Sequence, residues 1–206
     1  MSKQQIDELA ERYMEGARLN FQAHGHLIPI LAICGGPTDY VVQLKPGDWH
    51  PSDQLCAIAH GFGAVLPATH LVSVTEVWLK EFQPTEMDQE EADKLERGYL
   101  EARAAAGDPR VHTGLLVTVI DIKDLESSQL RSIDVDTGTE IQRFADMPVK
   151  EGDGYMPDRI WQAWKQGEEM AKSAPPDMDW MKMSTLLAAA DLIEAVMFGI
   201  KDWSEN

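Results

Sequence analysis

His70-Leu71-Val72-Ser73-Val74-Thr75-Glu76-Val77-Trp78-Leu79-Lys80-Glu81-Phe82 is the stretch that decides how the chain is built. It is rich in β-branched and aromatic residues, contains neither glycine nor proline, and is bounded by Pro67 and Pro84. These features predict a β-strand. Because both alternating faces carry apolar residues, we expect a central strand whose sheet is covered by helices on at least one face.

Further strands are predicted on either side of this stretch. Residues 112–122 are apolar on both faces and should pair with 70–82. Residues 27–33 and 40–44 predict a hairpin, because a glycine-rich turn separates them. Two short segments, 129–135 and 139–144, complete a sheet of about five mostly antiparallel strands.

Amphipathic spacing predicts the helices. Residues 2–23 form the first helix, which Gly25 ends, and Ser52 caps the second. The strongly charged segment 83–106 predicts an outer helix, with a largely solvated surface. We expect an α+β fold in which the first two helices cover one face of the sheet.

The last quarter of the chain has a different composition. We assign residues 1–146 to the sheet domain and residues 147–206 to a helical C-terminal extension, packed on that domain or on a partner chain. The extension contains a helix at 158–173 and a final helix that Ser184 caps and that runs to Trp203. The apolar side of this final helix has to be buried.

The charge of the chain limits its partners. It has 35 acidic and 18 basic side chains among 206 residues, a formal net charge of −17. Phosphate groups would be repelled by such a surface, so we expect neither direct nucleic-acid binding nor binding to an anionic membrane. A solvated acidic surface and a basic protein partner both fit this charge.

The two cysteines, Cys34 and Cys56, belong to no metal or disulfide pattern. We therefore expect reduced thiols and a cytoplasmic protein. The first residues lack the apolar core of a signal peptide. No stretch contains the roughly 18–20 apolar residues that cross a bilayer.

The order of the predicted elements resembles that of small uncharacterised α+β proteins of bacteria and phages. The similarity rests on the helix end at Phe21–His26, the following Ile28-Pro29-Ile30, and the VSVTEVW of 72–78. It extends from Ser2 to Phe144. The resemblance implies a fold and an origin in bacteria or phages, and it implies no activity or cofactor.

His24 and His26 are the candidate metal ligands of this sequence. On an extended segment, side chains two residues apart share a face, so both imidazoles can reach one ion. The alternative is a pair of exposed polar histidines at a helix end. The spacing selects no third ligand, for which His50, His60, His70 and many acids are candidates.

For the other residues that could carry chemistry, a structural role is favoured over a catalytic or binding role. Cys56 and His60 are spaced as a nucleophile and base on one helix face, but Cys56 adjoins a buried stripe. The Cys34-Gly35-Gly36 segment can hold an anion through backbone N–H groups, although a hairpin turn is the simpler interpretation. Several acids interrupt or end strands, where turn residues are usual: Glu76, Glu81, Asp121, Asp134 and Asp136.

Four of the six tryptophans and seven of the ten methionines follow residue 146. This enrichment is typical of an irregular core or of an adaptable interface. Since no catalytic motif is visible, we expect an accessory or interaction protein that meets a protein partner, or a second copy in a homo-oligomer, through this region. One alternative is an acidic decoy of a basic nucleic-acid-binding surface. The other is a small metal-dependent hydrolase that uses His24 and His26.

Overall fold

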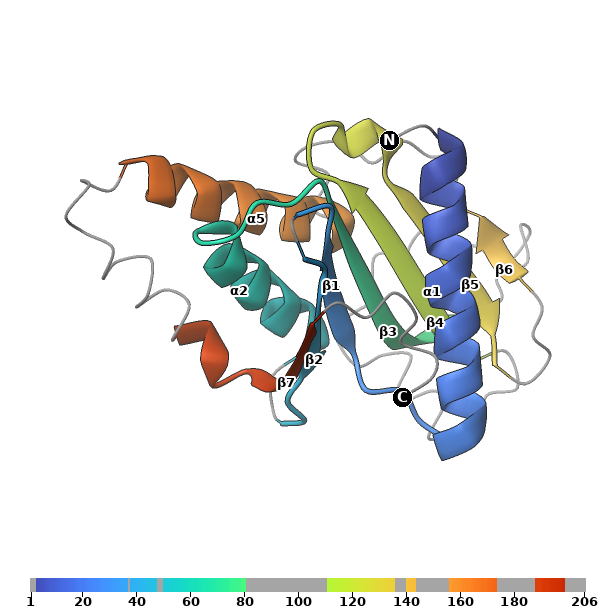
Figure 1. Cartoon of the computed structure of the whole chain (residues 1–206). Coiled ribbons are helices and arrows are strands. Elements are labelled where there is room, and N and C mark those ends of the chain that lie inside the picture. Colours follow the sequence, from blue (N-terminus) through green and yellow to red (C-terminus); the bar gives the residue numbers. More distant parts are fainter. Residues whose placement is uncertain are drawn as a thin grey trace, which may run out of the picture.

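The computed structural model describes residues 3–36, 38–47, 50–80, 111–135, 140–143, 156–173 and 188–198. Seven strands form one sheet with the order β6-β5-β4-β3-β1-β2-β7, and every neighbouring pair is antiparallel. The strands are β1 (Ile30–Cys34), β2 (Tyr40–Leu44), β3 (His70–Lys80), β4 (Val111–Asp121), β5 (Gln129–Asp134), β6 (Glu140–Arg143) and β7 (Ile193–Phe198). The helices are α1 (Lys3–His24), α2 (Pro51–Gly63), the short η1 (Leu125–Ser127) and α5 (Met156–Ser173) (Figure 1).

The predicted α+β class and the central place of the 70–82 stretch are confirmed. β3 lies between β1 and β4, and it pairs with β4 from His70 opposite Asp121 to Lys80 opposite Val111. The β1–β2 hairpin is confirmed as well. The sheet has seven strands rather than about five, because all six segments predicted as strands form strands and β7 adds another beyond β2.

Helix α1 covers one face of the sheet, mainly over β4, β3 and β5. Its predicted apolar stripe is confirmed, since Ile6, Ala10, Tyr13 and Ala17 are buried in one cluster with Val72 and other strand residues of that face. Gly25 ends the helix as predicted. It adopts a φ of 73°, and its N–H donates to the carbonyl oxygen of Phe21 at 2.7 Å.

Helices α2 and α5 together cover the opposite face. The prediction that the first two helices share a face is therefore wrong. Leu55 and Ile58 of α2 and Trp164 of α5 are fully buried in one cluster with Leu31 of β1. β1 and β3 carry apolar residues on both faces, so both faces of the sheet have to be buried. Helix α1 packs on one face and helices α2 and α5 pack on the other, which gives three layers (Figure 1).

Two glycines set the close approach of α2 and α5. A β-carbon on Gly63 would lie 2.6 Å from the backbone oxygen of Trp164, and one on Gly167 would lie 2.2 Å from the backbone oxygen of His60. Only a residue without a β-carbon fits at either position. Gly63, the last residue of α2, is thus also a contact point between two helices.

The N-terminus of α2 is capped by His50 and not, as predicted, by Ser52. The imidazole Nδ1 of His50 accepts from the Ser52 backbone N–H at 3.3 Å and lies 2.7 Å from the Ser52 hydroxyl. Pro51 then occupies the first position of the helix, where its missing N–H costs nothing.

The predicted final helix is wrong over 193–198, which form β7. Residues 188–190 are helical, and the chain then turns into the strand that pairs with β2. The segment IEAVMF is rich in residues that favour strands, and β2 offers it an open edge. The helical C-terminal extension is thus confirmed only for α5. The predicted outer helix at 83–106 lies outside the described residues.

Among the described residues, no helix combines the length and apolar character that crossing a membrane requires.

Candidate functional site

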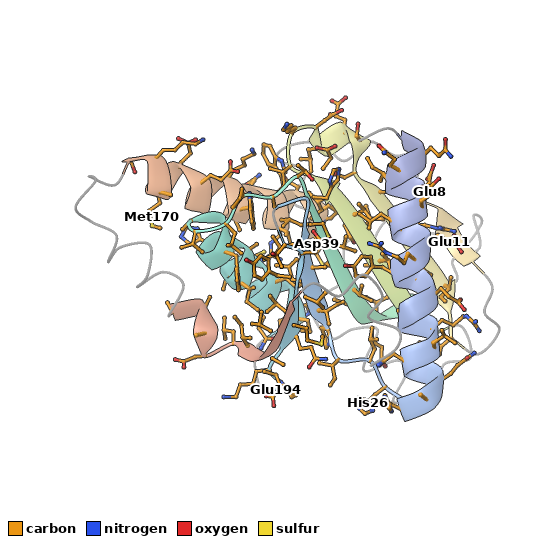
Figure 2. All side chains as sticks on the ribbon, in the orientation of Figure 1. Glu8, Glu11, His26, Asp39, Met170 and Glu194 are labelled. Atoms are coloured by element: carbon orange, nitrogen blue, oxygen red, sulfur yellow. The ribbon has the colours of Figure 1, made fainter. Side chains whose placement is uncertain are left out.

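A hollow of about 200 Å³ lies where α1 ends, β1 begins, and β2 and β7 form the sheet edge. Its polar lining comes from the side chains of two histidines and two amides, and its apolar lining from Ile28, Ile30 and Met197. The seven lining residues are Asn20, His24, His26, Ile28, Ile30, Gln43 and Met197. Figure 2 shows His26 beside the C-terminal end of α1.

The structure brings the two predicted metal ligands together. The ring centroids of His24 and His26 are 6.5 Å apart, with the ring planes inclined by 44°. Nδ1 of His26 lies 3.1 Å from the backbone carbonyl oxygen of His24. A carbonyl oxygen only accepts, so this contact places the proton of a neutral His26 on Nδ1 and leaves the Nε2 lone pair available.

The described residues supply no third ligand of the types first considered. They contain no group of three or more His, Cys, Asp or Glu side chains placed to hold one ion. Among the other candidate histidines, His50 caps α2, His60 lies on α2 beneath the opposite face, and His70 is buried. The metal-dependent hydrolase therefore stays a prediction: His24 and His26 line the hollow, and no carboxylate lines it.

Cys56 and His60 occupy neighbouring turns of α2, as their spacing predicted. Burial raises the pKa of the Cys56 thiol, and the nearby Arg159 guanidinium offsets that shift only in part. A catalytic thiol needs the opposite shift. Cys56 also packs at the border of the cluster under α2 and α5, as an apolar residue would.

The Cys34-Gly35-Gly36 segment is a turn. Gly35 adopts a φ of 86°, and its N–H donates to Oδ1 of Asp39 at 2.9 Å. A β-carbon at Gly35 would lie 1.9 Å from the Thr69 hydroxyl oxygen, so glycine is required there. The N–H group that an anion would need at Gly35 is already paired with Asp39.

A buried pair, His70 with Asp121, was missed by the sequence reasoning. Nε2 of His70 lies 3.3 Å from Oδ2 of Asp121, and both side chains are almost fully buried. Nδ1 of His70 contacts the Thr69 hydroxyl at 2.8 Å. Asp121 also accepts from the backbone N–H groups of Lys123 and Asp124. The pair depends on the exact register of β3 and β4, which the predicted pairing of 70–82 with 112–122 did not specify.

A thiol and a phenol meet on the same face of the sheet. Sγ of Cys34 lies 3.8 Å from the hydroxyl of Tyr13, and both residues are buried. Burial raises the pKa of the Cys34 thiol to about 11, and it raises the pKa of Tyr13 as well. Both groups therefore stay protonated at neutral pH, which is the behaviour of core residues rather than of a nucleophile and base.

Glu76 has a structural role that fits its place in β3. Its carboxylate accepts from the backbone N–H of Leu27 at 3.3 Å and so ties the segment before β1 to the central strand. Of the other acids considered, Asp134 ends β5, whereas Glu81 and Asp136 lie outside the described residues.

Four buried hydroxyl groups lie on the sheet face opposite α1. Ser73 and Thr75 of β3, Thr118 of β4 and Ser132 of β5 are at most 3% exposed and have no hydrogen-bond partner. Ser73 and Thr118 are direct cross-strand neighbours. The alternation of side chains along each strand places these four on the same face of the sheet.

These features define a three-layer α+β protein with a fully antiparallel sheet and a small hollow at one sheet edge. No protein-family model matches the chain, and no curated protein or solved structure matches it either.

Proposed function

We propose that this chain is a non-enzymatic accessory protein that binds a partner protein by adding a strand to β7. The composition of the two sheet edges carries this proposal. β7, with the sequence IEAVMF, contains a single charged residue, whereas β6 at the other edge has the largely polar sequence EIQR. In the described part of the chain, no strand pairs with the outer side of either.

An edge strand leaves alternate backbone N–H and C=O groups without a strand partner. Soluble proteins usually protect such an edge with lysine, proline or a bulge. β7 contains neither lysine nor proline, and its one register shift, opposite Gln43 and Leu44, affects only its beginning. The regular part, 195–198, can accept an added strand.

The side chains of β7 contact the apolar clusters on both faces of the sheet. Val196 packs at the border of the cluster under α2 and α5, whereas Met197 packs against the cluster under α1. Both remain partly exposed. A strand added beside β7 would therefore bury apolar surface on both of its faces, in addition to pairing its backbone.

Charge favours a basic partner over a second copy. The chain has a net charge of −17, and Asp191 and Glu194 are exposed at the start of β7. Two copies would repel each other, whereas an extended segment with lysine or arginine between apolar residues would be attracted. The acidic decoy shares this electrostatic basis, but its acidic stretch 81–101 lies outside the described residues.

A synthetic hexapeptide of alternating lysine and valine is a suitable probe. We expect it to bind, to slow backbone hydrogen exchange at 193–198, and to leave exchange in β6 unchanged. Raising the salt concentration should weaken binding steeply, because the attraction is between exposed charges. A peptide of alternating glutamate and valine is the matched control, and it should not bind.

Two results would contradict this proposal. Slower exchange elsewhere, with β7 unchanged, would remove strand addition as the mode of binding. A stable dimer of the chain alone, measured by light scattering and disrupted by Val196→Asp, would assign β7 to self-association instead.

A further inference from the structure

The hollow beside β7 combines imidazole nitrogens with a thioether sulfur. His24 and His26 line the hollow, and Met197 of β7, with its thioether sulfur, lines it as well. None of the seven lining residues carries a carboxylate. Two imidazoles with a thioether form a soft donor set, which suits Cu(I) and disfavours calcium and magnesium.

The contact of His26 with the backbone resembles that of a metal-bound histidine. Metal-binding histidines almost always donate their second ring N–H to a carboxylate or a backbone carbonyl, which orients the ring and fixes its tautomer. His26 makes this contact through Nδ1 to the carbonyl oxygen of His24. Its Nε2 is thereby the free donor before any metal arrives.

The spacing of the two rings is also compatible with a shared ion. With metal–nitrogen bonds of about 2 Å, two imidazoles on one ion place their ring centroids roughly 5–6 Å apart. The observed separation is 6.5 Å, and both side chains are exposed, so a small rotation of either ring closes the difference.

We propose that this hollow binds one Cu(I) ion through His24, His26 and Met197. The net charge of −17 supplies a long-range attraction for a cation, although no carboxylate lines the hollow itself. Binding would link the end of α1 to β7. The Cu(I) site does not depend on the proposed addition of a partner strand to β7, because the chain can bind copper whether or not it binds a peptide.

The experiment is a competition for Cu(I) against bicinchoninate under argon, with the full chain in a Cys56→Ser background. This background removes the partly exposed thiol, which would bind Cu(I) by itself. We expect one Cu(I) per chain. His26→Ala and Met197→Leu should each weaken Cu(I) binding by roughly tenfold or more, as loss of a ligand or its support does.

Matched controls separate the site from general effects. His60→Gln changes a histidine on the opposite face, and Met170→Leu changes a methionine on α5; Figure 2 shows Met170 far from His26. Both should bind Cu(I) as the parent does. X-ray absorption of the copper-loaded parent should show one sulfur ligand that Met197→Leu lacks. Failure of the parent to take Cu(I) from the chelator, or equal affinity in Met197→Leu and the parent, would overturn the proposal.

Discussion

His70 is the buried residue whose ionisation most directly links stability to pH. Burial lowers its pKa below the ordinary value of 6.5, and the neighbouring Asp121 carboxylate opposes that shift without cancelling it. The unfolded chain therefore takes up a proton at a higher pH than the folded chain does. The contribution of His70 to stability is complete above pH 6.5 and is lost as the pH falls below that value toward the folded-state pKa.

We predict that the free energy of unfolding decreases as the pH is lowered from about 7.5 to 5.5, a range above the titration of ordinary carboxyl groups. The decrease should be smaller in His70→Gln, which cannot be protonated. Urea unfolding at several pH values measures both profiles. His60→Gln is the control, and parallel profiles for the parent and His70→Gln would show that His70 does not carry the effect.

The pairing of 70–82 with 112–122 was predicted from the sequence, but the contact of His70 with Asp121 was not. A register that aligned the ends of the two segments would place His70 opposite Ile122 and Asp121 on the other face of the sheet, whereas the observed register places His70 opposite Asp121. His24 and His26 were found by their spacing alone. Met197 could not be predicted to lie near them, because its position depends on the pairing of β7 with β2, which are far apart in the sequence.

At the scale of elements, the crossing of α2 and α5 depends on the absence of two β-carbons. We predict that Gly167→Ala destabilises the protein by about 1–3 kcal/mol, the usual cost of overpacking a tight contact. The new β-carbon would lie 2.2 Å from the His60 backbone oxygen and 3.0 Å from the backbone nitrogen of Ala64, so the helices must separate.

The matched control for this substitution is Gly47→Ala. A β-carbon at Gly47 has no atom within 4 Å, and the backbone there does not have a positive φ. Urea unfolding of both variants compares the two sites. Equal free energies of unfolding for Gly167→Ala and Gly47→Ala would show that α2 and α5 can separate to accept a β-carbon without loss of stability.

The type of an element was predicted well where it depends on the periodicity of a short segment. It was predicted poorly where it depends on pairing with a strand far away in the sequence. The stripe of α1 and the alternation of β3 are properties of short segments, and both are confirmed. Apart from Glu194, the IEAVMF segment is apolar, so its sequence fits either a buried helix or a strand. The open edge of β2 made it a strand.

At the scale of the whole molecule, the net charge of −17 should destabilise the folded chain through self-repulsion. We predict that raising sodium chloride from about 0.05 to 0.5 M increases the free energy of unfolding, because salt screens exposed charges beyond a few ångströms. Urea, which is uncharged, is the suitable denaturant. A free energy of unfolding that is unchanged or lower at high salt would indicate that favourable ion pairs balance the repulsion.

The sequence by itself determined the α+β class, the central strand, its partner and the apolar faces that had to be buried. These follow from local composition and from side-chain periodicity, which each segment carries within itself. Only the tertiary structure decided which helices cover which face, that 193–198 pair with β2, and that Met197 reaches the hollow of His24 and His26. The physical reason is that an apolar surface specifies only that it must be buried, whereas the choice of cover depends on the shapes and open edges of the other elements.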